Sequence, residues 1–434
     1  MTLTVPMYSK ESRMMYYEIV VIGAGPAGMA AAIEAKRSGA GSVLVIDRDI
    51  ETGGILNQCI HSGFGLLRFN EELTGPEYAE RCSRSLVESG VTVMLDTMVM
   101  SLKSHGSEKL VRAMNPSHGL MDIHANAVIL AMGCRERTRG AIQIPGDRPS
   151  GVLTAGAAQR YVNIEGHKVG KGVVVLGSGD IGLIMARRLT LEGAMVLACV
   201  EIMPYSSGLT RNIVQCLDDF GIPLLLSHTV TKVIGKRRLE GVVIAEVGED
   251  RMPVAGTERF VECDTLLLSV GLIPENEITA GAGIDLDPRT KGPYVDRNME
   301  TSMEGVFACG NVVHVNDLAD HVSLEGERAG RSAAEYLRKF DETKGRKIVI
   351  LPGEGVAYAV PQHLSIVPGP GTAEISLRAD RVFKNAYLVV RDEKGSVLKR
   401  IRRPRITPGE MERISIKNDI ISGDSDMTIS IEEV

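Results

Sequence analysis

The stretch Gly23-Ala24-Gly25-Pro26-Ala27-Gly28 decides the fold of this chain. It follows an apolar run that begins at residue 17 and opens an Ala-rich helical pattern, the strand, turn and helix of a nucleotide-binding unit. The first glycine allows the tight turn, the second lets a pyrophosphate approach the backbone, and the third lets the helix pack closely. Asp47 ends the next apolar run, 24 residues after Gly23, where such folds place an acid that binds a ribose. The alternative interpretation is a glycine-rich turn in an ordinary α/β core.

The same pattern returns in Gly177-Ser178-Gly179-Asp180-Ile181-Gly182. Glu201 ends the next apolar run, again 24 residues after the first glycine. A carboxylate at this place would bind the ribose hydroxyls and repel a 2′-phosphate, and residues 202–207 contain no Arg or Lys to bind one. The second motif therefore favours NAD(H) over NADP(H), the alternative being that Glu201 only caps a strand. Two such units predict an α/β chain with two Rossmann-like domains.

The rest of the chain divides into two further pieces. From Thr301 a strand over Gly305–Cys309 and a helix over Ser323–Phe340 can complete the first sheet, and the charged residues 341–345 predict a linker. Residues 347–434 carry short alternating strands, such as 373–378, 386–391, 396–400 and 427–432, separated by Pro, Gly and Asp. This pattern predicts a small C-terminal all-β, sandwich-like domain. Earlier in the chain, a helix over 76–89 is expected to bury Tyr78, Cys82, Leu86 and Val87, and another helix is expected over 211–220.

Composition narrows the class of protein. The 434 residues include 49 Lys and Arg against 55 Asp and Glu, and a net charge of −6 gives no reason to expect nucleic acid or an anionic membrane as a partner. The seven cysteines are scattered with no two three residues apart, which predicts free thiols in a reducing compartment, with no CxxC pair, metal site or iron–sulfur ligand set. The first 13 residues lack an apolar signal core, and no apolar run reaches the length of about 18 residues needed for a transmembrane segment. We therefore expect a cytoplasmic protein.

Three more segments, with the two glycine motifs, fall in a characteristic order. They are Ala127-Val-Ile-Leu-Ala131-Met132-Gly133, Leu268-Ser-Val-Gly271-Leu-Ile-Pro274, and Thr301 to Asn311. In this order the chain resembles the FAD-dependent pyridine nucleotide–disulfide oxidoreductase superfamily, with a thioredoxin-reductase-like or NADH-oxidase-like core over roughly residues 17–340. The resemblance implies a discontinuous FAD-binding domain over 15–135 and 268–342 and an NAD-binding domain over 136–267. The β-rich domain predicted from the strand pattern covers 347–434. It also implies hydride transfer between the nicotinamide of NAD(H) and the flavin.

The resemblance assigns binding of FAD and NAD(H) to a set of residues in these motifs. They are Gly23, Gly25, Ala27, Gly28, Asp47, Arg48, Gly54, Ile55, Val99, Ala131, Gly133, Gly177, Gly179, Asp180, Gly182, Glu201, Gly271, Gly310, Asn311 and Val322. Two positions depart from the family pattern. Asp47 is one methylene shorter than the usual Glu, so its ribose contact runs through water. Asn311 replaces the usual Asp, so it can bond a ribityl hydroxyl without contributing charge.

The helix after the second FAD motif points its N-terminus at the flavin in this family. Backbone N–H groups near Val322 and Ser323 are therefore expected to stabilise the reduced flavin. His321 is a candidate proton donor there, the alternative being a capping or surface histidine.

Disulfide reductases of this superfamily carry CxxxxC beside the flavin or CxxC in the NAD domain, and this chain has neither pattern. We therefore expect no disulfide reduction through a dithiol of its own. Cys59 lies 36 residues after Gly23, close to where single-cysteine peroxide and oxygen reducers place theirs. A reactive thiolate needs a nearby positive charge, for which His61 is the candidate, and the alternative is a packed thiol.

Residues 53–65 and 133–139 resemble one branch of the superfamily. That branch contains α subunits of amino-acid, opine and cyanide-forming dehydrogenases, and proteins encoded beside a glycerol-3-phosphate dehydrogenase-like flavoprotein. Several members have a cysteine-rich iron–sulfur module at the C-terminus, whereas residues 347–434 contain no Cys. The resemblance thus implies a homo- or hetero-oligomer in which a partner flavoprotein or iron–sulfur subunit exchanges electrons with this chain.

Two alternative functions stay open at this point. In one, the chain is a free-standing NADH oxidase or peroxidase that uses Cys59. In the other, it is a non-catalytic assembly subunit that holds its cofactors structurally. The basic run Lys399–Arg405 is a solvated strand face, or it is a docking patch for an acidic partner.

Overall fold

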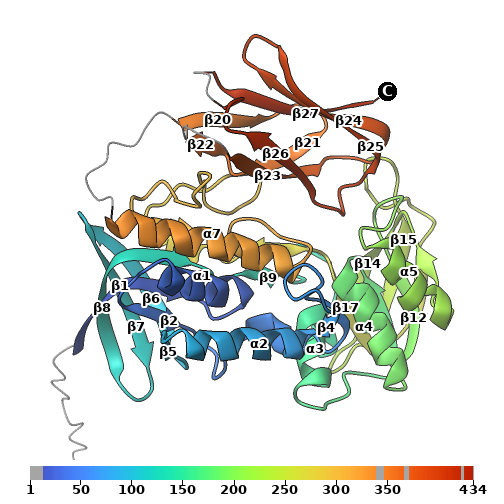
Figure 1. Cartoon of the computed structure of the whole chain (residues 1–434). Helices are drawn as coiled ribbons and strands as arrows, with labels where there is room; N and C mark the ends of the chain where they lie inside the picture. The colour runs from blue at the N-terminus through green and yellow to red at the C-terminus, as the bar shows by residue number, and fades with distance from the viewer. Residues whose placement is uncertain (1–12, 339–346, 366–370, 422–424, 434) are drawn as a thin grey trace, which may run out of the picture.

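The computed structural model describes residues 13–338, 347–365, 371–421 and 425–433. Two nucleotide-binding domains lie side by side, and a C-terminal β domain sits over helix α7 of the first (Figure 1). The polar N-terminal stretch up to residue 12, the expected linker 341–345 and the end of the helix expected to reach Phe340 lie outside the described residues. In the described part, no helix is both long and apolar enough to cross a membrane.

The first domain is a mixed sheet built from two separate chain segments. The strands follow the order β5-β2-β1-β8-β7-β6, and β19, which comes after the second domain in the sequence, joins β8. The pairs β1–β2, β2–β5, β1–β8 and β8–β19 are parallel, whereas β6, β7 and β8 form an antiparallel meander. The bounds are β1 Arg13–Ile22, β2 Val43–Ile46, β3 Ser62–Phe64, β4 Leu73–Thr74, β5 Thr92–Met94, β6 Met98–His105, β7 Glu108–Asn115, β8 Gly119–Leu130 and β19 Val306–Ala308.

Helices α1 (Pro26–Arg37), α2 (Gly75–Glu88) and α7 (Ala319–Arg338) belong to this domain. A Cβ atom at Gly326 or Gly330 of α7 would collide with carbonyl oxygens of α1, so these glycines allow the two helices to touch. In α2, Tyr78, Cys82 and Leu86 are buried as expected, but Val87 is 74% exposed. The three buried residues are spaced four positions apart and so lie on one face of the helix, whereas Val87 lies on a neighbouring face that is exposed.

The second domain has a parallel sheet and a smaller antiparallel one. The parallel strands follow the order β10-β17-β11-β12-β13, and β14, β15 and β16 form the other sheet. The bounds are β10 Val152–Thr154, α3 Ala155–Asn163, β11 Gly172–Leu176, α4 Asp180–Leu191, β12 Met195–Val200, α5 Thr210–Cys216, β13 Leu224–Leu225, β14 His228–Ile234, β15 Gly241–Glu246, β16 Arg259–Glu262 and β17 Thr265–Leu268. The helix expected to reach Phe220 ends earlier, and a 3-10 turn, η2 (Asp218–Phe220), leads into left-handed Gly221.

Two crossovers join the nucleotide-binding domains. Strand β9 (Cys134–Glu136) leaves the first domain, β18 (Leu272–Pro274) returns to it, and the two pair with each other antiparallel. The short helix α6 (Glu277–Gly281) follows β18. Both parallel sheets have the Rossmann-like arrangement that the two glycine motifs predict.

The C-terminal domain is a sandwich of two sheets with its own apolar core. One sheet has the order β22-β20-β27-β24-β25 and the other β21-β23-β26. The bounds are β20 Lys347–Pro352, β21 Val356–Val360, β22 His363–Ser365, β23 Thr372–Ala379, β24 Phe383–Asp392, β25 Val397–Ile406, β26 Glu412–Lys417 and β27 Met427–Glu433. The all-β prediction is confirmed. Within the basic run on β25, Arg403 forms an ion pair with Glu412 at 2.8 Å and Arg400 covers the ring of Tyr387.

Candidate functional site

In the first glycine turn, two glycines are required by the packing of the protein itself, and the third would be required only by a bound ligand. A Cβ at Gly23 would collide with the carbonyl of Ala131, and a Cβ at Gly28 with the carbonyl of Gly23. At Gly25 a Cβ would have no neighbour within 4 Å. Gly25 also begins α1 without any side-chain cap, so the first-turn N–H groups of the helix are not satisfied by a capping residue. This open, positively polarised helix end fits a pyrophosphate.

Asp47 anchors this turn. Its Oδ2 accepts the Ala24 N–H at 2.5 Å, and its Oδ1 accepts the Asp49 N–H at 2.8 Å. The neighbouring Arg48 is exposed. The carboxylate therefore holds the backbone of the glycine turn in place, and the ribose contact through water stays a prediction.

The second glycine turn likewise has one glycine required by packing and one with open space around it. A Cβ at Gly177 would collide with the carbonyl of Ser269, whereas the nearest atom to a Cβ at Gly179 is 3.5 Å away. Helix α4 begins at Gly179 without a side-chain cap, as α1 does at Gly25. Glu201 is buried, and its Oε2 accepts both the N–H and the Oγ–H of Ser178, at 2.9 and 2.6 Å. Its Oε1 accepts the Met203 N–H at 2.9 Å.

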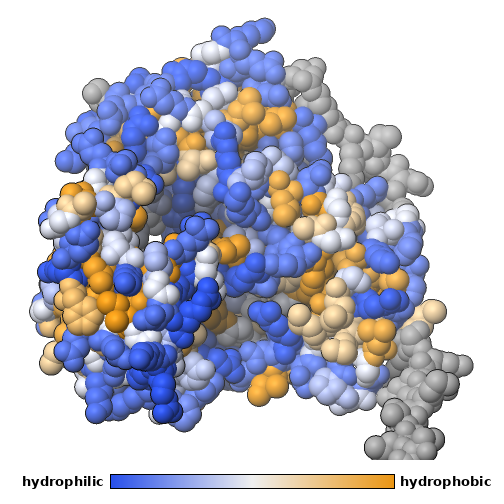
Figure 2. All heavy atoms as spheres, turned by 180° about the vertical axis from the view of Figure 1, so that it is seen from behind, coloured by the Kyte–Doolittle hydropathy of each residue, from blue (hydrophilic) through white to orange (hydrophobic). Residues whose placement is uncertain are grey.

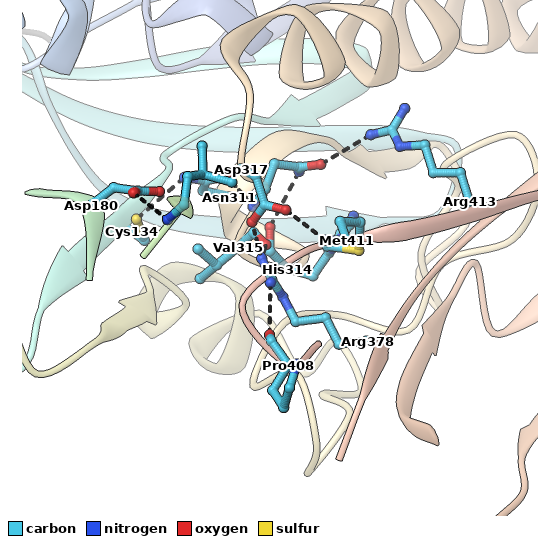
Figure 3. Close-up of polar contacts among 12 residues, drawn as sticks. Cys134, Asp180, Asn311, His314, Val315, Asp317, Arg378, Pro408, Met411 and Arg413 are labelled. Atoms are coloured by element: carbon cyan, nitrogen blue, oxygen red, sulfur yellow. Dashed lines mark hydrogen bonds and ion pairs between the residues drawn. The ribbon is translucent and has the colours of Figure 1, made fainter. Parts of the chain in front are cut away.

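Asp180 lies in the first turn of α4, but it is engaged within the protein. Its Oδ1 accepts the Leu209 N–H at 2.9 Å and the Asn212 side-chain amide at 2.7 Å. Asp180 thus ties the start of α5 to the second glycine turn. Figure 3 shows its carboxylate on the side of Cys134 and Asn311. A contact with the cofactor would have to use its other oxygen.

The second FAD motif packs directly on the first glycine turn. A Cβ at Gly310, in the 3-10 turn η3 (Gly310–Val312), would come within 2.8 Å of the Ala27 methyl group. The Oδ1 atom of Asn311 accepts the Asn316 N–H at 2.9 Å, and its Nδ2 lies 3.6 Å from the Cys134 thiol (Figure 3). Asn311 therefore stabilises its own loop and contacts the crossover strand β9 through Cys134. Burial raises the pKa of the Cys134 thiol to about 11.

The remaining expected residues divide between buried and exposed positions. Gly54 begins the 3-10 turn η1 (Gly54–Gln58), and a Cβ there would lie 3.2 Å from Gly25 Cα, so it borders the same turn. Ile55 beside it is 57% exposed. The side chains of Val99 and Ala131 are part of the first domain's core, which leaves their backbone atoms for a ligand. Gly133 and Gly271 both have positive φ at the two crossovers.

The start of α7 differs from expectation. The helix begins at Ala319, and the N–H groups of His321 and Val322 both donate to the Leu318 carbonyl, at 3.1 and 3.2 Å. Asp320 lies in the first turn, where its charge favours a helix N-terminus. Its carboxylate also accepts the Leu67 N–H at 3.2 Å. His321 lines a cavity between α7 and the C-terminal domain, where burial and the nearby charge of Arg413 lower its pKa.

Cys59 is half-buried, and its thiol is hydrogen-bonded within the protein. It follows η1 and donates to the Ile55 carbonyl at 3.2 Å, with Gln159 Oε1 at 3.8 Å. Burial raises the pKa of Cys59 to about 12, and burial also lowers the pKa of His61. Both shifts keep the pair neutral at physiological pH, so the geometry favours the packed-thiol alternative over a reactive thiolate.

The sequence reasoning missed a buried pair behind the second FAD motif. Glu325 of α7 accepts the Gly310 N–H at 3.0 Å and contacts His314 Nε2 at 2.8 Å. Burial raises the pKa of Glu325, but His314 and the Gly310 N–H outweigh it, so the pKa lies below its ordinary value. The sequence signal was weak, since Glu325 is one of several charged residues on a polar helix. No cluster of three or more His, Cys, Asp or Glu that could hold a metal occurs among the residues the structure describes.

The contact between the two nucleotide-binding domains was not predicted from the sequence. The Gln58 side-chain amide donates to the Gly156 carbonyl and to Gln159 Oε1, both at 2.9 Å. Asn163 donates to the Gln58 carbonyl at 2.8 Å. These bonds hold η1 of the first domain against α3 of the second.

Residues 17–326 match the model of the family described as pyridine nucleotide-disulphide oxidoreductase. The chain belongs to this family. It is accordingly an FAD-dependent oxidoreductase, since members of the family bind FAD and NAD(P)H, and both glycine turns fit a dinucleotide. The family match ends within α7, before the C-terminal domain.

Curated relatives of this family member include subunits of larger enzymes. One opine oxidase subunit, from Agrobacterium tumefaciens, is 28% identical over 74% of this chain and 66% of its own length. The small chain of glutamate synthase [NADPH] from Halomonas elongata is 29% identical over 74% of this chain and 68% of its own length. The chain thus spans about two thirds of the length of these relatives. Among solved structures, T. acidophilum thioredoxin reductase is 26% identical with a TM-score of 0.63, covering 75% of this chain and 99% of that one.

Proposed function

We propose that the chain is the NAD(H)-binding flavoprotein subunit of a multi-subunit dehydrogenase. It would exchange a hydride between nicotinamide and flavin and pass electrons to or from a partner subunit. The observation that carries the proposal is the pair of uncapped glycine turns, at Gly25 and Gly179, in one chain. Each turn has an open middle glycine and an acid that anchors the backbone.

FAD supplies a ring that accepts or donates a hydride at N5. The chain's own residues supply orientation and the exclusion of water. The N-termini of α1 and α4 would each hold a pyrophosphate. The bonds between Gln58 and α3 fix one domain against the other, which sets how the two bound dinucleotides would face each other.

Glu201 supports NAD(H) over NADP(H). Its buried carboxylate is already fixed by three donors, so a 2′-phosphate nearby would face a charge that cannot turn away. We expect kcat/KM for NADH to exceed that for NADPH by at least about 10-fold, which corresponds to about 1.4 kcal/mol. Glu201→Gln should lower this ratio, and exposed Glu262→Gln should not. Steady-state rates with both nucleotides test this, and a wild-type preference for NADPH would refute it.

The second electron carrier is proposed to belong to another chain. One curated relative is an oxidase subunit and another is a synthase small chain, which supports a carrier on a separate chain. The lack of cysteine in residues 347–434 also supports it. The seven cysteines include no CxxC or CxxxxC spacing, which favours an electron acceptor other than a disulfide. We propose a partner flavoprotein of the glycerol-3-phosphate dehydrogenase kind, or an iron–sulfur subunit.

Two measurements test the proposal. Anaerobic mixing of purified protein with NADH should bleach the flavin band rapidly, and an unchanged spectrum with FAD bound would mean that the cofactors are structural. The chain alone should consume little oxygen, and proteins that co-purify from native cells should restore turnover. Rapid oxygen consumption by the chain alone would identify an oxidase instead.

Cys59 is not required in this proposal. Because burial raises the pKa of its thiol to about 12, it is protonated at neutral pH. Cys59→Ser should therefore leave the rate of flavin reduction by NADH within about 2-fold of wild type. A loss of oxygen or peroxide reduction in this variant, with flavin reduction intact, would restore the peroxidase alternative.

A further inference from the structure

A cavity of about 390 Å³ separates α7 from the C-terminal domain. Its floor is one face of α7, with His321 and Arg328, and its roof is the sheet β21-β23-β26. Ser376 and Arg413 are directly paired across β23 and β26, so they lie in one row of this roof. Figure 1 shows this sheet directly over α7. None of the described residues that line the cavity belongs to either glycine turn.

Arg413 is poorly satisfied in this position. Its Nε atom is buried and has no partner among the described residues, and its Nη2 makes only a long contact of 3.4 Å with Asn316 Oδ1. The side chain points toward the second FAD motif (Figure 3). Burial lowers the pKa of Arg413, Glu325 opposes this shift, and the charge of Arg328 lowers the pKa further. A partly buried guanidinium whose buried Nε–H has no acceptor costs free energy unless a ligand supplies one.

The acids around the cavity already have other partners. Glu325 is bound to His314 and to the Gly310 N–H. Glu327 pairs with Arg68 at 2.5 Å, and Glu374 accepts the Ser415 hydroxyl. The described residues place no carboxylate within ion-pair distance of Arg328 or Arg413. Glu325 and Glu374 attract Arg413 only from farther away, so both guanidinium groups keep room for a direct oxyanion partner.

We propose that this cavity binds a small organic anion through its carboxylate or phosphate group. Arginine is suited to both groups because its planar guanidinium donates two parallel hydrogen bonds to an oxyanion. Ser376 offers a hydroxyl beside Arg413, and the apolar side chains of Val360, Pro361 and Leu324 offer a surface for the carbon skeleton. The volume is within the range of small-molecule sites, about 300–1,000 Å³. Anion binding in this cavity does not depend on whether the proposed partner subunit exists.

Isothermal titration tests this proposal on the FAD-loaded protein saturated with NAD⁺, so that the pyrophosphate sites are filled. The probes are inorganic phosphate, sn-glycerol 3-phosphate and succinate. At least one should bind saturably, and the probe that binds tells phosphate from carboxylate recognition. Arg413→Gln and Arg328→Gln should each weaken its binding by about 10-fold or more, because each removes a charge-assisted pair.

Two controls keep the test decisive. Arg331→Gln removes a lining arginine that is already paired with Glu34 at 2.8 Å, and it should change the affinity much less. Arg413→Lys keeps the charge and should retain part of the binding that Arg413→Gln loses. FAD content and melting temperature show that each variant is folded. Binding of no probe at millimolar concentration, or binding equal in wild type and both Gln variants, would overturn the proposal.

Discussion

Gly25 and Gly28 are only three residues apart, yet different forces require them. A side chain at Gly28 would collide with the protein's own backbone, so this glycine belongs to the packing of α1 on the sheet. A side chain at Gly25 would meet no protein atom, and the backbone φ of −74° suits any residue. The glycine motif predicts these separate roles, and the surroundings of the two glycines in the structure differ in the same way.

Gly25→Ala should therefore lose flavin without losing the fold. Its methyl group would occupy the space where the pyrophosphate approaches the backbone, so we expect FAD affinity to fall at least about 10-fold. The melting temperature of the apoprotein should stay near wild type. The flavin-to-protein absorbance ratio and a thermal melt of the apoprotein measure both effects. Gly281→Ala is the matched control, because a Cβ there also has open space and lies in α6. Full retention of FAD in Gly25→Ala would contradict our account of the turn.

At the scale of elements, α7 serves two neighbours with two faces. Gly326 and Gly330 let it touch α1, and Glu325 reaches the second FAD motif. The hydrophobic pattern predicted this helix. It did not predict that the helix starts at Ala319 or that Glu325 binds the second FAD motif. For α2, spacing correctly predicted three buried residues and wrongly included Val87. A periodic pattern locates the centre of a buried face well and its edges poorly.

Glu325→Gln should destabilise the protein in a pH-dependent way. The pKa of Glu325 is lowered in the folded protein, so its ionised form adds stability above its ordinary pKa of 4.5, and this stability is lost as pH falls. We expect a loss of about 2 kcal/mol at neutral pH, which shrinks as the pH falls below 4.5 toward the lowered pKa of the folded protein. Urea unfolding at both pH values measures it, with exposed Glu335→Gln of the same helix as control. An equal loss at both pH values would mean that the charge of Glu325 contributes nothing.

At the scale of the whole molecule, the C-terminal domain is fastened to both nucleotide-binding domains. Arg378 donates to the Val315 carbonyl at 3.1 Å and to Asp317, and Asp317 also accepts the Met411 N–H at 2.7 Å (Figure 3). On the other side, a Cβ at Gly409 would lie 2.5 Å from the Ser207 carbonyl of the NAD domain. The face in Figure 2 is hollowed in the middle, below this domain. The loop between β25 and β26 thus reaches both cofactor domains.

Arg378→Gln should loosen this attachment. The Arg378 and Asp317 side chains are 15% and 20% exposed. The loss should therefore lie between the roughly 0–1 kcal/mol of a surface pair and the roughly 3–5 kcal/mol of a fully buried one. We expect faster hydrogen exchange in residues 311–318 and faster proteolysis between the domains. Arg381→Gln is the control, because Arg381 pairs with Asp380 and Glu354 at the surface, where such pairs contribute about 0–1 kcal/mol. If both variants exchange alike, Arg378 does not hold the domains together.

The two nucleotide-binding domains, the return of the chain to the first sheet and the all-β C-terminal domain could all be predicted from the sequence. These predictions depend on local patterns: glycines in tight turns, an acid at a fixed distance along the chain, and alternating strands. The folded protein was needed to see that Glu325 supports Gly310, that His321 and Arg413 line one cavity, and that Arg378 binds Asp317, 61 residues away. Such contacts join distant segments, and their energies depend on burial and on partners that no local pattern encodes.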